Sequence, residues 1–175
     1  MVEEFEPIKV KKVWYFGDNI NTDDIVPHQF LTENDPDVIV KNAFKTINPE
    51  FAANAEENDI IIGGRNFGTG SSREEAVFVL RALGIKAVIA ESFARIYYRN
   101  LINNGIPAIE MKDARGKIQN LRELTINLKK GAIVGVDSKN EQITVKFSPI
   151  PDFIMNILKA GGAISMLKRQ LKSIS

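Results

Sequence analysis

Apolar residues follow two spacings along this chain: short β-branched runs between turn residues, and stretches that recur every three or four positions. The first spacing is typical of buried strands and the second of amphipathic helices. Strands are expected at Lys9–Phe16, Ile60–Gly63, Lys86–Ala90 and Pro107–Ile109. Helices are expected near Arg73–Leu83 and Phe93–Asn103, each ended by a glycine, Gly84 or Gly105. The resulting order, β-α-β-α-β, predicts an α/β fold.

The remaining third of the chain has a different pattern. Three runs that alternate or are β-branched predict an antiparallel meander of Leu124–Leu128, Ala132–Val136 and Gln142–Phe147. A helical pair, Phe153–Leu158 and Ala163–Leu171, is expected on either side of Gly161 and Gly162.

The segment Phe30–Asn58 has little pattern and predicts loop and short helix, a kind of segment that is usually functional or mobile.

Length and composition narrow the class of protein. The 175 residues correspond to about one domain, so residues 1–175 are expected to form a single domain. With 23 basic and 22 acidic residues, the net charge of +1 gives no reason to expect a nucleic-acid or membrane surface. No apolar run approaches the ~20 residues of a membrane span, and we expect a cytoplasmic location.

Cysteine is absent and histidine occurs once. Iron–sulfur clusters are held by cysteine thiolates, and zinc sites usually need several histidines or cysteines. This polypeptide is therefore expected to hold neither kind of centre by itself.

The chemistry-bearing motif is the glycine-rich stretch Asn66–Glu74, which joins a predicted strand to a predicted helix. Its hydroxyls and arginine at a helix start are suited to an anion, because the first helical N–H groups lack partners. A P-loop is excluded, since Thr69 stands where the phosphate-binding lysine would be. A dinucleotide fingerprint is excluded as well, since Arg73 replaces its third glycine.

Helix capping explains part of the same motif without a ligand. Ser71 with Glu74, and Ser72 with Glu75, both fit the capping-box spacing. Arg73 in the first helical turn opposes the helix dipole at a cost of a few tenths of a kcal/mol, which favours a bound anion. Both interpretations stay open at this point.

Several runs of the sequence carry a family resemblance. They are Gly17–Pro27, Gly68–Glu74, Ala87–Ile96, Asn103–Pro107, and Pro151–Phe153 through Ala160–Gly162. Together they resemble the swivelling domain of the aconitase superfamily, whose free-standing form is the small subunit of the 3-isopropylmalate dehydratase and homoaconitase type. The resemblance implies a swivelling β/β/α domain of the aconitase C-terminal type. Its central sheet would be mostly parallel, with flanking helices and an added antiparallel meander.

The chemistry implied by this resemblance is reversible dehydration of a hydroxy-dicarboxylic acid. A 4Fe-4S cluster acts as the Lewis acid in this superfamily and a protein base removes a proton beside a carboxylate. Since the chain has no cysteine, the cluster is expected on a partner large subunit, in a heterodimer or heterotetramer. The chain would then be a hydro-lyase subunit that is active only with that partner.

Site residues follow from the resemblance, position by position. Ser71 corresponds to the catalytic base, and Asp23 to the aspartate near the cluster-bound water, with Thr22 as its neighbour in the substrate site. Ser72 and Arg73 correspond to the residues that hold a substrate carboxylate. A simpler interpretation of Asp23 remains, because it lies in a turn rich in Asn and Asp, where backbone hydrogen bonding is common.

Substrate choice in this family depends on an early loop, here Phe30, Leu31 and Thr32, which we include among the substrate-binding residues. Thr32 is neither the arginine that would pair with an extra carboxylate nor the apolar residue that would face an isopropyl group. Glu75 also departs from the family pattern, which has histidine there. The leading substrate is 3-isopropylmalate, the intermediate of leucine biosynthesis. Alternative substrates are homoaconitate and a methyl- or dimethylmalate. An alternative of another class is a non-catalytic anion-binding regulatory module.

Two more arginines are possible members of the site. Arg95 and Arg99 lie four residues apart on the second predicted helix and could line a cleft. Helical arginines usually form a solvated or ion-paired face. They are left out of the predicted site for that reason.

Overall fold

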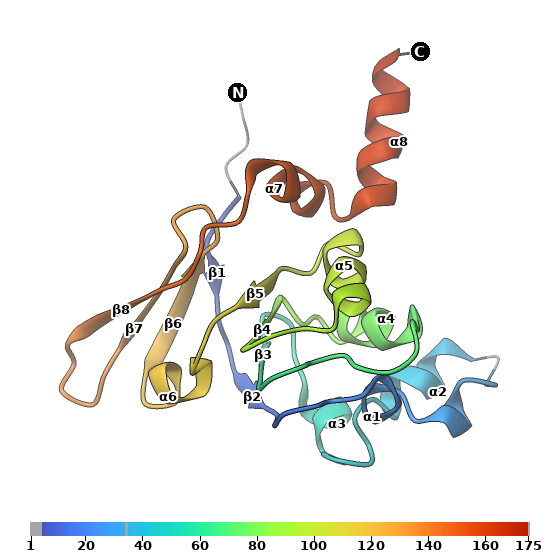
Figure 1. Ribbon diagram of the computed structural model, residues 1–175, viewed down its shortest axis with the longest axis horizontal. Coiled ribbons are helices and arrows are strands. Elements are labelled where there is room, and N and C mark those ends of the chain that lie inside the picture. The colour runs from blue at the N-terminus through green and yellow to red at the C-terminus, as the bar shows by residue number, and fades with distance from the viewer. Residues whose placement is uncertain (1–4, 34, 175) are drawn as a thin grey trace.

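A computed structural model describes residues 5–33 and 35–174 of the chain. Residues 1–4, 34 and 175, which the single-domain prediction included, lie outside this part. The described strands form two sheets of four strands each. Figure 1 shows the two sheets side by side, with helices α4 and α5 on the far side of the parallel sheet from the antiparallel one.

The parallel sheet holds its strands in chain order. They are β2 (Val13–Tyr15), β3 (Ile60–Gly63), β4 (Ala87–Ala90) and β5 (Ala108–Glu110). Every neighbouring pair is parallel, which confirms the predicted parallel sheet. All residues of β3 and β4 are buried, as strands covered on both faces must be.

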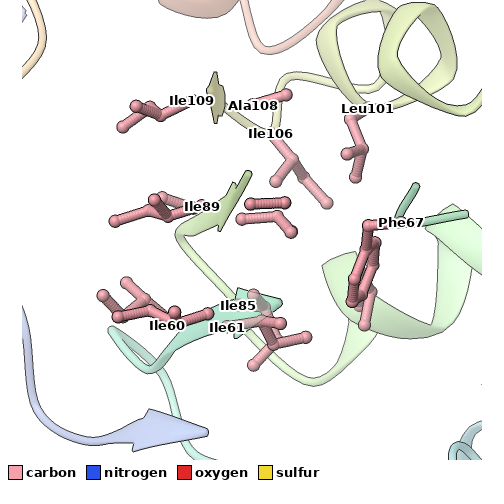
Figure 2. Close-up of a cluster of buried hydrophobic side chains, with 14 of the residues drawn as sticks. Ile60, Ile61, Phe67, Ile85, Ile89, Leu101, Ile106, Ala108 and Ile109 are labelled. Carbon is pink, nitrogen blue, oxygen red and sulfur yellow. The ribbon is translucent and has the colours of Figure 1, made fainter. Parts of the chain in front are cut away.

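Side chains of these strands fill the core on both faces of the sheet. Figure 2 shows Ile60, Ile89 and Ile109 pointing to one face, while Ile61 points to the other, the face on which Leu101 lies. All five are at most 1% exposed. Full burial of such a side chain contributes about 1.5–3 kcal/mol, so this double-sided core holds the strand ends in fixed positions.

Two helices connect the parallel strands, α4 (Glu75–Ala82) between β3 and β4, and α5 (Arg95–Asn103) between β4 and β5. Right-handed crossovers that advance in one direction place both helices on the same face. Both helices begin two residues later than predicted. The predicted starts at Arg73 and Phe93 are wrong. Before α5 the Ala94 N–H donates to Phe67 O, and before α4 the N–H groups of Gly68 and Thr69 donate to Ile20 O, so both approaches follow a loop course.

The long connection between β2 and β3 contains loop and short helices, as predicted. They are α1 (Thr22–Ile25), a 3-10 turn η1 (His28–Phe30), α2 (Pro36–Lys41) and α3 (Phe51–Asn54). Phe44 and Phe51 from this connection are fully buried and pack on Phe16, with the Phe16 and Phe44 ring centroids 4.2 Å apart. An aromatic cluster therefore fastens the connection to the core.

The antiparallel sheet confirms the predicted meander and adds a strand to it. Its order is β1 (Ile8–Lys9), β6 (Arg122–Asn127), β7 (Ala132–Val136) and β8 (Gln142–Lys146). The single strand predicted over Lys9–Phe16 is wrong: β1 pairs with β6, and β2 pairs with β3 in the other sheet. Val10 donates to Leu124 O and Lys11 to Asn58 O, so the chain changes sheets at these residues.

Three helices complete the described chain: α6 (Ala114–Ile118), α7 (Asp152–Lys159) and α8 (Ala163–Ile174). The last two confirm the predicted helical pair, while α6 has no counterpart in the prediction. Helix α7 packs on α5, and α8 extends away from the body of the molecule (Figure 1). Within the described residues, no helix has the length and apolar character needed to cross a membrane.

Candidate active site

Three loops meet beyond the carboxyl ends of β2, β3 and β4, the edge at which open parallel sheets bind ligands. The loop after β2 and the loop after β3 pair through Asn21 and Thr69, and the Thr22 N–H donates to Thr69 O at 2.8 Å. The loops after β3 and β4 pair through Phe67 and Phe93. Hydrogen bonds therefore join the three loops into one surface.

A cavity of about 320 Å³ opens where these loops meet α5. Its polar lining residues are Thr22, Ser71, Ser72, Arg73, Arg95 and Asn100, together with Tyr97 of the first α5 turn. Four of the predicted site residues thus line one cavity, although they come from two loops far apart in sequence. None of the described lining residues is acidic.

Two glycines give the loop its close fit. Gly68 has a φ of +80°, and a Cβ there would overlap the ring of Tyr97. Gly70 has a φ of +94°, and a Cβ there would meet the Asn21 side chain. A left-handed backbone conformation favours glycine at both positions. These glycines let Ser71 lie directly against the loop that carries Thr22.

Ser71 is exposed, and its backbone is fixed by Thr22. The Thr22 hydroxyl, on a residue only 1% exposed, donates to Ser71 O at 3.0 Å. Among the described residues, the Ser71 hydroxyl makes no hydrogen bond of its own. Thr22 is therefore a positioning residue in the isolated chain, since its hydroxyl is already used by the serine loop.

The predicted capping boxes at this helix are wrong. Helix α4 begins at Glu75, and its N-cap residue Glu74 makes no side-chain capping bond. Ser71 and Ser72 precede the helix, and the Ser72 hydroxyl accepts a long hydrogen bond of 3.5 Å from Asn100. The hydroxyls of Ser71 and Ser72 consequently do not cap helix α4. The capping box forms at α1 instead, where Asn21 and Asp24 satisfy each other's backbone N–H groups.

Arg73 forms an ion pair with Asp23 and a weak 3.5 Å contact with Val26 O, both through Nη1. Its side chain is 15% exposed, whereas that of Asp23 is 53% exposed. Asp23 does not line the cavity but reaches the site through Arg73. The guanidinium keeps Nε and Nη2 without a hydrogen-bonding partner in the described part of the chain.

A second ion pair joins the same two loops at a distance from the cavity. Arg65 donates to Asp18 from its backbone N–H at 2.8 Å and from Nη2 at 2.9 Å. These hydrogen bonds, the backbone one first, hold the pKa of Asp18 below its usual value. Deeper inside, burial raises the pKa of Tyr97, whose hydroxyl donates to Ala76 O.

The predicted specificity residues stand apart from the cavity. Phe30, Leu31 and Thr32 are not among its lining residues. Phe30 ends the 3-10 turn η1, with Lys45 Nζ 5.2 Å from its ring centroid. Their proposed role stays a prediction, and the same holds for Glu75, the first residue of α4.

Sequence reasoning missed Arg95 and Asn100, which line the cavity from α5. Arg95 also lines a neighbouring cavity between α5 and α7, and Arg99 lines only that second one. Equal helical spacing made the two arginines indistinguishable in the sequence. The orientation of α5 over the glycine loop separates them.

The residues of this chain do not fit an iron–sulfur cluster. The sequence contains no cysteine thiolate to hold one and a single histidine. In the described residues, no three His, Cys, Asp or Glu side chains come together as a metal site.

Comparison with known proteins identifies the family. Residues 3–114 match the aconitase C-terminal domain model. The chain therefore belongs to the aconitase C-terminal domain family, in agreement with the sequence resemblance and the predicted fold. It is 40% identical to the 3-isopropylmalate dehydratase small subunit 1 of Methanopyrus kandleri over 91% of this chain and 92% of that one.

Two further matches come from one organism, Methanocaldococcus jannaschii. Its isopropylmalate/citramalate isomerase small subunit is 42% identical over 91% of this chain and 94% of that protein. A crystal structure described as 3-isopropylmalate dehydratase matches with a TM-score of 0.80 and 38% identity. The match covers 94% of this chain and 95% of that one. The two proteins therefore share nearly the whole fold.

Proposed function

We propose that this chain is the small subunit of a 3-isopropylmalate dehydratase, a hydro-lyase of leucine biosynthesis that works only with a large subunit. The observation that carries the proposal is the cavity in which Ser71, Ser72 and Arg73 meet Thr22. Relatives that match over nine tenths of the chain are named dehydratase or isomerase small subunits.

Ser71 is proposed as the base that takes a proton from the carbon beside a substrate carboxylate. Its exposed hydroxyl has no competing hydrogen bond among the described residues, and the Thr22 contact fixes its backbone at 3.0 Å. A serine acts as a base only when its alkoxide is stabilised. Since α4 begins four residues later, we assign this stabilisation to Arg73 rather than to the helix terminus.

Arg73 and Ser72 are proposed to hold one substrate carboxylate. The free Nε and Nη2 of Arg73 present the two-donor edge that suits a carboxylate. Asp23 keeps Nη1 occupied and thereby fixes the orientation of the guanidinium. In this proposal Asp23 also faces the reacting water, as the family resemblance implies.

The proposal places the 4Fe-4S cluster on the partner large subunit, because this chain has no residues that fit one. The assembly would be a heterodimer or a heterotetramer. No nucleic acid or membrane is part of the proposal. A cytoplasmic location stays a prediction.

The side group of the substrate is the open specificity question. A relative named for both isopropylmalate and citramalate supports testing acids with branched and small side groups. Thr32 is neither apolar nor cationic. Its side chain therefore does not by itself select a branched group over a small one. Homocitrate, dimethylmalate and citrate complete the panel.

The test is anaerobic reconstitution of this chain with its cognate large subunit, followed as enoate absorbance. Ser71→Ala should reduce kcat by about 10²–10⁴-fold, the usual contribution of a general base. Ser138→Ala is the matched control, since Ser138 is exposed in the turn after β7 and distant in sequence from the site. Unchanged turnover of Ser71→Ala would refute the base role.

The same experiment separates the catalytic proposal from the alternative class. A stable wild-type complex with an intact cluster but no turnover on any acid of the panel would refute the dehydratase. That result would favour a regulatory anion-binding module. Turnover of 3-isopropylmalate supports the proposed substrate, and preference for another acid would replace it.

A further inference from the structure

Two cationic side chains line the candidate cavity, Arg73 and Arg95, and they differ in their charge balance. Arg73 is largely covered and paired with Asp23. Arg95 is exposed and makes no ion pair with any described residue. With no acidic residue in the described lining, the cavity therefore carries one uncompensated positive charge, on Arg95.

We infer that Arg95 binds the second carboxylate of the dicarboxylic substrate. The inference rests on the proposed function and names a binding residue that the sequence prediction left out. A dicarboxylate needs two cationic or strongly donating groups to offset its desolvation. Arg73 with Ser72 supplies one of them, and Arg95 supplies the other.

The geometry of α5 supports this assignment. The Ala94 N–H donates to Phe67 O at 2.9 Å, which ties the start of α5 to the glycine-rich loop. One turn further, Asn100 Nδ2 contacts the Ser72 hydroxyl at 3.5 Å. Arg95 is therefore attached to a backbone held against the serine loop at two points, and its guanidinium can share a ligand with Ser72.

The local sequence gives Arg95 no structural reason to be an arginine. It is the first residue of α5, where the helix dipole disfavours a cation. Its exposed side chain makes no ion pair with the rest of the described chain that would offset this cost. Arg99, four residues along the same helix, lines only the neighbouring cavity beside α7, which Arg95 and Glu110 also line. The pair thus provides a test residue and a matched control on one helix.

The experiment uses the reconstituted complex with its cluster, comparing Arg95→Gln, Arg95→Lys and Arg99→Gln. Arg95→Gln should raise KM by about 10–100-fold, the effect of losing one charge-assisted hydrogen-bonded contact, and change kcat much less. Arg95→Lys should recover part of the loss, because it keeps the charge without the planar two-donor edge. Arg99→Gln should stay within about twofold of wild type.

A ligand that cannot react gives an independent readout. Isopropylsuccinate keeps both carboxylates but lacks the hydroxyl group, so its inhibition constant reports binding alone. That constant should rise with Arg95→Gln in parallel with KM. Raising the salt concentration should weaken inhibition of the wild type more than of Arg95→Gln, because the variant has one charge contact fewer.

Three outcomes would overturn the inference. An unchanged KM and inhibition constant for Arg95→Gln would remove Arg95 from substrate binding while leaving the proposed function intact, provided Ser71→Ala is inactive. Failure of Arg95→Gln to assemble with the large subunit, measured by size-exclusion chromatography, would make it an interface residue. Absence of turnover by the wild-type complex would refute the proposed function and this inference together.

Discussion

Replacing Thr22 by valine tests whether the loop after β2 positions Ser71. The substitution keeps the shape of the side chain and removes one buried hydroxyl. That hydroxyl donates to Ser71 O at 3.0 Å, and Thr22 is only 1% exposed. The backbone bond from Thr22 N–H to Thr69 O remains, so the two loops stay paired at one point.

The expected magnitude follows from the one short hydrogen bond that is lost, since the other contact of this hydroxyl, to Asn21 Oδ1, is 3.5 Å long. A typical intramolecular hydrogen bond contributes about 0.5–1.5 kcal/mol net. Because Ser71 is exposed, its carbonyl can turn to water, so we expect a stability loss of about 1 kcal/mol, or 2–4 °C in Tm. The same free energy that held Ser71 in its reactive position corresponds to roughly a 3–10-fold fall in kcat.

The assay is steady-state kinetics of the reconstituted complex beside thermal unfolding of the isolated chain. KM should change less than kcat, since Ser71 acts on the proton that moves in the transition state. Thr22→Ser restores the hydroxyl and should recover most of kcat. Equal kcat values for Thr22→Val and wild type would refute the positioning role. A large rise in KM alone would show that Thr22 contacts substrate instead.

Two further predictions concern stability. Gly68→Ala should lower the free energy of unfolding by on the order of 2–4 kcal/mol and Tm by about 5–15 °C, because alanine is strained at a φ of +80° and its Cβ overlaps the Tyr97 ring; a normal melting curve would contradict this. Arg65→Gln should lower Tm at pH 7: it leaves the backbone N–H of residue 65, the largest cause of the lowered Asp18 pKa, but removes the guanidinium donors and charge that lower that pKa further below its usual 3.8. A depressed folded-state pKa stabilises above the unfolded value, so the difference from wild type should vanish as the pH falls below about 3.8 and through the lower folded value; a difference that is constant with pH would contradict it.

Strands buried on both faces were predictable from the sequence. The runs at Ile60–Gly63 and Ala87–Ala90 are apolar throughout, because helices cover one face and the second sheet covers the other. The turn residues between the last three strands gave the meander. In both cases the signal is local, and it lies within the residues that form the element.

Strand partners and helix starts were harder to predict because they depend on distant residues. Nothing near Val10 indicates that the backbone there pairs with Leu124 rather than continuing into β2. The late start of α4 has a similar cause. Gly68 and Thr69 both donate to Ile20 O, and this bonding holds the loop in a non-helical course that its helix-like spacing conceals.

The candidate site likewise contains residues that the sequence predicted and residues that only the structure reveals. The family resemblance supplied Ser71, Ser72 and Arg73, and the structure brings them into one cavity with Thr22. Arg95 and Arg99 have equivalent positions in the pattern of α5, so only the placement of that helix against the glycine loop separates them.

The change of sheets between β1 and β2 has a consequence for the order of synthesis. All four strands of the parallel sheet are complete once residue 110 has left the ribosome, so that sheet can assemble early. Ile8 pairs with Ile126, which is made later. Strand β1 therefore has no partner in its sheet until β6 emerges, and pairing of strands so remote in sequence is intrinsically slow. Strand β1 therefore stays accessible to a chaperone or a neighbouring nascent chain until β6 has been synthesised.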